Sequence, residues 1–389
     1  LLAIAKEMLV AYYFGVSSIL DTFNIALALP TVIILYFSAA FRGSFIPLYL
    51  EWSHRLSTER ADDHALFMLY CSGLFFGLLT LIGYLFSPLI FPTIGYGLAA
   101  EEKVLGISIQ RLLIFLLFLD GMGIVLENLL HAQKRFFTLY LSRTLINATS
   151  ILFIVYGYQQ GIYALIWGLL LGTLLKLIGM AGRLRRIGFR FFRRVSIDRE
   201  KISELIILAL PLLGSELIAN SNAFIDIVMA SQLPPGSVAT LRYAYRTNDL
   251  PVQIIIIAMS QAIFPYISKQ VLEKDHHGLR DIFSHSVTLL GFITFPIIAL
   301  VMLFSTDIVA ILYERGAFDA FATRQTAETL VFYNVGLFFC SYAFINGAFF
   351  LALKDTRPLL YLGCLSLILN ILFNILFMNI FGVKGIALS

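Results

Sequence analysis

The sequence predicts an all-α polytopic membrane protein with two pseudo-symmetric six-helix lobes around a central cavity. Its residues are 59% hydrophobic and only 13% charged, with a mean hydropathy of +0.86, whereas a soluble domain carries about 25% charged residues. Apolar runs long enough to cross a hydrocarbon core of about 30 Å recur along the whole chain. These runs are uniformly apolar rather than alternating, which indicates helices and not barrel strands.

Eleven apolar runs are long enough to be considered as spans, and a twelfth begins near Gly382. We expect the spans at 1–14, 22–50, 65–92, 104–132, 137–158, 160–182, 203–232, 238–268, 282–313, 325–352 and 356–380. The chain begins within the first run and stops soon after the start of the last. We therefore expect a longer protein, truncated here at both ends.

Basic residues in the connections predict the orientation in the membrane. The connections at 51–64, 133–136, 183–202, 269–281 and 353–357 hold 17 of the 28 Lys and Arg residues. The alternate connections hold four. Because loops rich in Lys and Arg stay in the cytoplasm, we expect a cytoplasmic N-terminus. The net charge of +4 is thus a topology signal, and no nucleic-acid partner is expected.

An internal repeat predicts the domain organisation. At an offset of 221 residues, Gly15 corresponds to Gly236, Asp21 to Arg242 and Pro30 to Pro251. Six spans separate the copies, so the two repeats should have the same orientation in the membrane. We predict an N-lobe over 1–182, a basic cytoplasmic linker over 183–202 that lies on the lipid headgroups, and a C-lobe over 203–389.

Seven basic residues fall inside predicted spans and suggest an anionic cargo. A Lys or Arg at the centre of a bilayer helix costs about 2.5–3.5 kcal/mol, so it normally faces protein or water. Four of them are our candidate ligands for a phosphate-bearing substrate: Lys6, Arg42, Arg242 and Arg246. The alternatives are an ion pair with Glu7 for Lys6 and extension toward the outer headgroups for Arg242. For the other three, Arg111, Arg143 and Lys176, we expect ion pairing or extension to the nearest headgroups.

Acidic residues inside the spans have two possible roles. Asp120 and Glu127 lie two helical turns apart on one face, where pairing with basic side chains is the alternative to function. Asp226, Asn370 and Asn374 offer one carboxylate and two amide oxygens, which suit Na⁺ as a coupling ion. Hydrogen bonding between helices is the alternative for the asparagines.

No enzyme signature is present in the sequence. The six histidines form no ligand motif, and there is no Walker loop, dinucleotide fingerprint or nucleophile elbow. The three cysteines, Cys71, Cys340 and Cys364, lie in separate spans without metal-ligand spacing, and we expect them to be buried. We expect no catalytic activity, no cofactor and no metal apart from Na⁺.

Several segments resemble the MviN/MurJ family of lipid II flippases, within the multidrug/oligosaccharidyl-lipid/polysaccharide exporter superfamily. The similar segments are Lys6–Gly15, Asp21–Asn24, Leu29–Pro30, Phe45–Pro47, 229–251 (MASQLPPGSVATLRYAYRTNDLP), Leu312–Phe318, 352–358 and 382–388. The resemblance implies export of an undecaprenyl-pyrophosphate-linked peptidoglycan precursor to the outer leaflet. It also implies that Lys6 replaces a family arginine and that Arg246 matches a family arginine, while Glu7 and Asp21 are supporting acids.

The chain departs from the family at three places. The family's tandem arginines are replaced near Ile33–Ile34, a nearby Glu is lost around Ser38, and the Asp before the span 8 arginine is Tyr245. These changes keep two alternatives open: a flippase for another polyprenyl-linked glycan, of the O-antigen or capsule type, and a non-transporting scaffold for the cell-wall synthesis machinery. A monomer in contact with membrane lipids is expected in each case.

Overall fold

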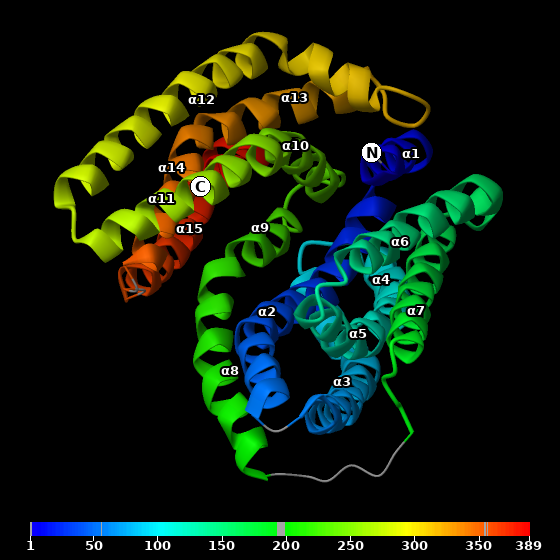
Figure 1. The fold of residues 1–389 in the computed structure, drawn as a ribbon. Helices are drawn as coiled ribbons and strands as arrows, with labels where there is room; N and C mark the ends of the chain where they lie inside the picture. The colour runs from blue at the N-terminus through cyan, green and yellow to red at the C-terminus, as the bar shows by residue number, and fades with distance from the viewer. Residues whose placement is uncertain (1, 56, 193–198, 354, 356) are drawn as a thin grey trace. The chain divides into compact units, whose positions relative to one another are not determined.

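The fold is all-helical throughout the part of the chain that the computed structural model describes, namely 2–55, 57–192, 199–353, 355 and 357–389 (Figure 1). Hydrocarbon offers no hydrogen bonds to a peptide group, so apolar segments satisfy their backbone internally as helices. Each predicted span corresponds to one helix or one broken helix, which confirms the all-α polytopic fold class. Among the described residues, eight helices are individually long and apolar enough to cross a membrane, or up to ten if each bent pair counts as one span.

By packing, the chain divides into two compact units. Unit 1 comprises Leu1–Phe14 and Ser18–Gln232, and unit 2 comprises Gly15–Ser17 and Leu233–Ser389. The helices of unit 1 are α1 (Leu2–Phe14), α2 (Ser18–Arg55), α3 (Thr58–Ile94), α4 (Ala100–Leu113), α5 (Phe115–Ala132), α6 (Phe136–Gly157), the 3₁₀ turn η1 (Tyr158–Gln160), α7 (Ile162–Arg186), α8 (Arg199–Asn220) and α9 (Asn222–Ala230).

The helices of unit 2 are interrupted more often. They are α10 (Ser237–Pro251), the π-helical turn η2 (Val252–Ile256), α11 (Ile257–Glu273), α12 (His276–Tyr313), α13 (Ala320–Val335), α14 (Leu337–Ala352), α15 (Arg357–Phe381) and α16 (Val383–Leu388). Pro251 has no N–H to donate, and the π turn directly after it accommodates that interruption. The α13–α14 pair bends by 44° at Gly336.

The division into units differs from the predicted lobe boundary at 183–202, of which 193–198 lies outside the described residues. Helices α8 and α9 pack along α2, and Tyr36 Oη lies 2.8 Å from Ser221 Oγ at the break between α8 and α9. Ser231 Oγ, just after α9, donates to the carbonyl of Ile94 in unit 1. The first span of the predicted C-lobe thus packs with the N-terminal helices. The division of the chain into two repeated lobes stays a prediction.

The two glycines of the repeat have corresponding conformations. Gly15 precedes α2 with φ +55°, and Gly236 precedes α10 with φ +91°. Such positive φ angles are accessible to glycine at little cost. Proline follows within each helix, at Pro30 in α2 and Pro251 in α10. The sequence repeat is therefore accompanied by a repeated local structure.

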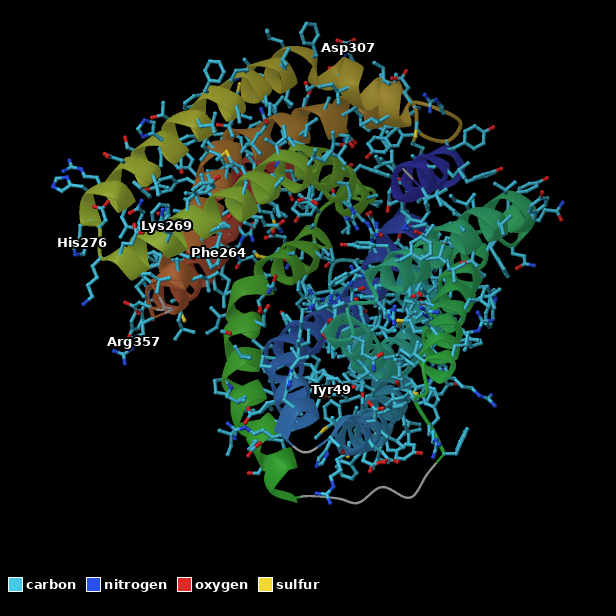
Figure 2. The ribbon with its side chains drawn as sticks, viewed as in Figure 1. Tyr49, Phe264, Lys269, His276, Asp307 and Arg357 are labelled. Atoms are coloured by element: carbon cyan, nitrogen blue, oxygen red, sulfur yellow. The ribbon has the colours of Figure 1, made fainter. Side chains whose placement is uncertain are left out.

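Side-chain oxygens define several helix starts. Ser57 Oγ accepts from Arg60 N, Asp275 Oδ1 from Gly278 N, and Asp319 Oδ1 from Ala322 N, so each caps the helix that follows it. The Asp275 cap lies in the turn between α11 and α12. Figure 2 shows Lys269, His276 and Arg357 at one end of unit 2 and Asp307 near the opposite end of α12. Described residues of both basic connections of this unit, Lys269 and His276 of one and Arg357 of the other, thus lie at the same end.

The core of unit 1 extends into the basic linker. Buried residues of α2, α3, α5 and α7 pack together with Phe189, which is only 3% exposed. Tyr70 Oη donates to the carbonyl of Phe191 at 2.6 Å, while Phe192 is 98% exposed. The start of the linker is therefore anchored to unit 1, and Phe192 is available to the lipid surface.

Candidate functional site

The predicted phosphate ligands of unit 1 have different surroundings. Lys6 Nζ lies 3.2 Å from Glu7 Oε1, and both side chains are largely enclosed, at 15% and 14% exposure. The ion pair that the sequence offered as an alternative for Lys6 is thus present. Asp21 is buried near the start of α2. Arg42 is exposed on the same helix.

The helix that carries Arg42 packs against two neighbours. Helices α5 and α8 both contact α2. On α8, the Glu216 carboxylate accepts from Asn220 Nδ2 at 2.8 Å. Arg42 thus belongs to a helix that is packed on two sides, and its own side chain is exposed.

Unit 2 places both of its predicted arginines on α10. Arg242 is half-buried and Arg246 is exposed, four residues further along the helix. Side chains at this spacing lie on the same helix face. Tyr245, which replaces the family's acid, packs its ring edge-on against Tyr333 with centroids 5.9 Å apart. Whether these arginines share one substrate site with Lys6 and Arg42 of unit 1 is not addressed by either unit alone, and the common site stays a prediction.

Asn370 and Asn374 form a buried oxygen cluster with Ser389. Asn374 Nδ2 donates to Asn370 Oδ1 at 3.3 Å, and Ser389 Oγ donates to Asn374 Oδ1 at 2.7 Å. Ser389 Oγ also lies 2.8 Å from the carbonyl oxygen of Ile386. Asn374 is fully buried and Asn370 nearly so. The structure thus brings the two asparagines together, as their spacing predicted, and adds Ser389, which the sequence analysis missed.

Both amide oxygens of this cluster accept hydrogen bonds, which is the alternative that the sequence analysis gave for the asparagines, and the ion site stays a prediction. Amide, hydroxyl and carbonyl oxygens are ligands for Na⁺ or Ca²⁺ rather than for transition metals. Within the described residues, no group of three or more His, Cys, Asp or Glu side chains could hold a metal ion. The third predicted ligand, Asp226, is half-buried in α9 of unit 1. Its part in an ion site therefore stays a prediction.

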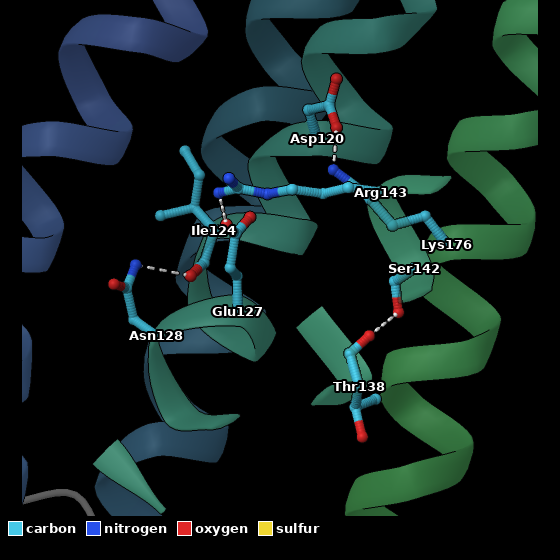
Figure 3. Close-up of polar contacts among 8 residues, drawn as sticks. All are labelled: Asp120, Ile124, Glu127, Asn128, Thr138, Ser142, Arg143 and Lys176. Atoms are coloured by element: carbon cyan, nitrogen blue, oxygen red, sulfur yellow. Dashed lines mark hydrogen bonds and ion pairs between the residues drawn. The ribbon is translucent and has the colours of Figure 1, made fainter. Parts of the chain in front are cut away.

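The two acidic residues of α5 form ion pairs. Pairing with basic side chains is the alternative to a functional role that the sequence analysis gave for them. Lys176 Nζ of α7 lies 2.5 Å from Asp120 Oδ1, and Arg143 of α6 pairs with Glu127 (Figure 3). Of the two outcomes expected for Arg143 and Lys176, extension to the headgroups is the favoured one, and the structure instead shows the other one, ion pairing, for both. Arg111 instead lies over the ring of Tyr84, with its guanidinium carbon 5.3 Å from the ring centroid.

The cysteines correct one expectation. Cys71 and Cys340 are exposed and Cys364 is half-buried, so the expected burial of the first two is wrong. A thiol is apolar enough to face lipid, and hydrophobicity alone does not distinguish a lipid-facing position from a core position.

Comparison with known proteins identifies the family. The model of the family described as lipid II flippase MurJ matches residues 10–389. This chain belongs to the MurJ family. A probable lipid II flippase MurJ of Rhizobium meliloti (strain 1021) is 27% identical over 398 residues, covering 98% of this chain and 73% of that protein. The probable MurJ of Borreliella burgdorferi is 24% identical over 393 residues, covering 100% of this chain and 77% of that protein.

Solved structures agree with a MurJ fold. A lipid II flippase MurJ in an inward closed conformation superposes with a TM-score of 0.87 at 24% identity, covering 100% of this chain and 81% of that chain. An inward-facing multidrug resistance MATE family transporter of the MOP superfamily gives 0.83 at 17% identity, covering 100% and 89%. At these identities the structures support the fold, and the family match supports the membership.

Proposed function

We propose that this MurJ family member moves lipid II from the inner to the outer leaflet of the bacterial cytoplasmic membrane by alternating access. The single observation that carries the proposal is the family match over residues 10–389. A multi-pass helical fold with basic residues inside its spans agrees with a lipid-linked, anionic cargo. We infer a flippase without covalent chemistry, because the work is translocation and not bond cleavage.

Four basic residues hold the pyrophosphate in this proposal: Lys6, Arg42, Arg242 and Arg246. Guanidinium groups bind phosphate oxygens bidentately, and the interaction strengthens where water is scarce. Lys6 has three N–H donors, so the pair with Glu7 leaves it able to donate to a phosphate. Asp21 and Glu7 limit the excess positive charge when no substrate is bound.

The cycle requires the bound headgroup to be exposed to one side of the membrane at a time. The polyprenyl tail stays in lipid while the charged headgroup crosses between the two lobes. Proline within α2 and the π turn after Pro251 allow these helices to bend as access changes. The N-terminus lies in the cytoplasm in this proposal, because the connections on its side carry most of the basic residues.

A Na⁺ gradient supplies the driving force in this proposal. The oxygens of Asn370, Asn374 and Ser389 fit the ion, and the carboxylate of Asp226 would balance its charge. Ligands from α9 and α15 would then link ion binding to the conformational state, because both must be in place for tight binding.

Translocation of lipid II in vesicles tests the function and the role of Arg246. We expect wild-type protein to expose lipid II to an external probe and Arg246→Ala to lose at least about tenfold in rate, since a charge-assisted hydrogen bond contributes about 1.5–3 kcal/mol. Arg280→Ala, near the start of α12 at the end predicted to face the cytoplasm, is the matched control and should be close to wild type. Wild-type activity in Arg246→Ala would refute its proposed role.

Na⁺ dependence tests the ion site separately. We expect Na⁺, but not K⁺ at equal ionic strength, to raise the melting temperature of the purified protein. Asp226→Ala and Asn374→Ala should each abolish the increase. An increase that persists in both variants would place the ion elsewhere.

The missing arginines near Ile33–Ile34 are a specific reason to consider another polyprenyl-linked glycan. Rescue of a strain depleted of its lipid II flippase separates the two substrates: rescue supports lipid II, and failure by a well-expressed protein favours the other glycan. A scaffold of the cell-wall synthesis machinery would translocate neither lipid in vesicles.

A further inference from the structure

Two buried polar side chains meet where α2 ends and α3 begins. Trp52 lies in the last turn of α2, and His64 lies in the second turn of α3. Their ring centroids are 5.1 Å apart, and only 2% of Trp52 and 5% of His64 is exposed. The two rings are therefore in contact with each other and enclosed by protein.

The buried nitrogens of this pair have opposite hydrogen-bonding roles. His64 Nδ1 lies 2.6 Å from the carbonyl oxygen of Arg60, which can only accept, so Nδ1 carries the proton in the neutral ring. His64 Nε2 is then an acceptor, whereas Trp52 Nε1 carries the donor N–H of the indole. Neither Nε2 nor Nε1 has a hydrogen-bond partner among the described residues, and both atoms are inaccessible to solvent.

The orientation of the two rings does not allow a direct hydrogen bond between them. Their planes are inclined by 36°, which is nearer to stacked than to perpendicular. The indole N–H and the imidazole lone pair each lie in the plane of their own ring. In this arrangement the N–H cannot point at the lone pair with the angle above about 150° that a hydrogen bond prefers. A buried donor and a buried acceptor thus lie side by side, and leaving both unsatisfied is costly.

A neighbouring contact between the same two helices is direct. Tyr49 Oη, one turn before Trp52 on α2, donates to Asp62 Oδ1 of α3 at 2.8 Å. It also accepts from Gln133 Nε2, at the end of α5, at 3.4 Å. The tyrosine therefore needs no further partner to join α2 to α3. At Trp52 and His64 a further group is needed to complete the polar contact.

We propose that Trp52 and His64 bind an ordered internal water molecule, which accepts from the indole N–H and donates to His64 Nε2. Water fits because it accepts and donates at once, whereas an anion would satisfy only the N–H and a metal cation only Nε2. The water joins α2 to α3 beside the buried core residues Ala61 and Phe189. It requires no cargo, so the site is independent of the proposed function.

Ultraviolet resonance Raman spectra of the purified protein test the site through the indole band that reports hydrogen bonding at Nε1. Subtraction of the matching Trp52→Phe spectrum isolates the signal of Trp52. We expect this band at the position of a hydrogen-bonded N–H in the wild type. His64→Leu should shift the band to the position of a free N–H, because the acceptor that holds the water is lost. His64→Gln, which keeps an acceptor, should retain the bonded position.

Tyr49→Phe is the matched control, because it removes the direct hydrogen bond to Asp62 between the same helices. It should lower the melting temperature and leave the Trp52 band where it is. A general loosening of the α2–α3 contact would move the band in this variant too, and that result would contradict a water held by Trp52 and His64.

Two further results would overturn the proposal. One is a free N–H band in the wild type, and the other is a bonded band that His64→Leu leaves unchanged. An experimental structure at a resolution that shows ordered waters decides the rest, even if His64→Leu does not fold. Density within hydrogen-bonding distance of both Trp52 Nε1 and His64 Nε2 would support the water, whereas a direct N–H···N contact or an empty site would refute it.

Discussion

Single charged residues in the spans of this protein are stabilised in three different ways. Lys176 is enclosed with Asp120, Arg111 lies over an aromatic ring, and Arg143 is held by a buried carboxylate while its side chain remains half exposed. Of the three side chains, Arg143 is the most exposed. Exposure and pairing must therefore be considered together when a membrane arginine is assigned a role.

Gly15 combines a positive φ angle with a very close approach. A Cβ at this position would lie 2.2 Å from the carbonyl oxygen of Ala317, which is backbone and cannot move aside easily. We expect Gly15→Ala to lose about 1–3 kcal/mol from the strained φ and a further loss of about 1–3 kcal/mol from overpacking. The fall in melting temperature of detergent-purified protein measures the effect.

Gly161→Ala provides the control for the strained backbone alone. Gly161 has φ +60°, and nothing lies within 4 Å of the position that a Cβ would occupy there. The melting temperature of this variant should fall by clearly less than that of Gly15→Ala. Equal losses would show that the contact with Ala317 contributes nothing.

At the scale of elements, α6 and α7 form the most closely packed helix pair of unit 1, and they lie side by side in Figure 1. Small residues bring their backbones together: a Cβ at Gly168 would lie 2.7 Å from Ser150 Cα, and Thr149 Oγ1 donates to the carbonyl of Gly168 at 2.9 Å. Such packing is typical of helix association in lipid, where apolar burial between helices gives no advantage over lipid contact.

Two glycines of α7 should therefore respond in opposite ways to alanine. At Gly172 a Cβ would lie 2.2 Å from Thr149 Oγ1 and 2.6 Å from Ile146 Cα, so Gly172→Ala should destabilise by about 1–3 kcal/mol. At Gly182 nothing lies within 4 Å, and Gly182→Ala should stabilise through helix propensity by up to about 1 kcal/mol. Thermal melting of both variants checks the sign. A stabilising Gly172→Ala would contradict the close packing.

At the scale of the whole molecule, the basic connections predict which ends of the helices face the cytoplasm. In unit 2 the turn at His276 and the turn after Tyr313 lie at opposite ends of α12. Figure 2 shows Lys269 and Arg357 at the first end, and the sequence adds Lys274 and Arg280 beside His276. The positive-inside rule then predicts that His276 faces the cytoplasm.

Cysteine labelling tests this orientation. In a variant with alanine at Cys71, Cys340 and Cys364, we expect a membrane-impermeant maleimide to label Glu314→Cys in intact cells. His276→Cys should be labelled only after permeabilisation, which also serves as the control for its reactivity. Labelling of position 276 in intact cells would reverse the topology.

Much of the candidate site depends on side-chain contacts, and the sequence predicts these contacts only as one of two possible roles for each residue. The spacing of Asn370 and Asn374 correctly placed them together, because residues four apart on a helix share a face. The same spacing rule could not reveal Ser389, which reaches Asn374 through the turn before α16. Nor could it decide whether Lys6 is paired, because the orientation of adjacent side chains depends on the helices around them.

The sequence by itself determined the fold class, the position of nearly every helix and the family, because hydropathy and backbone hydrogen bonding leave an apolar segment few alternatives in a membrane. Only the tertiary structure decided which carboxylate pairs with which cation, and that α8 and α9 pack with the N-terminal helices. Such pairings join residues far apart in the chain, and they depend on helix rotation and packing, which a linear pattern of apolar residues does not specify. The distinction between enclosed Lys176 and exposed Arg143 is therefore a property of the fold, although both residues are evident in the sequence.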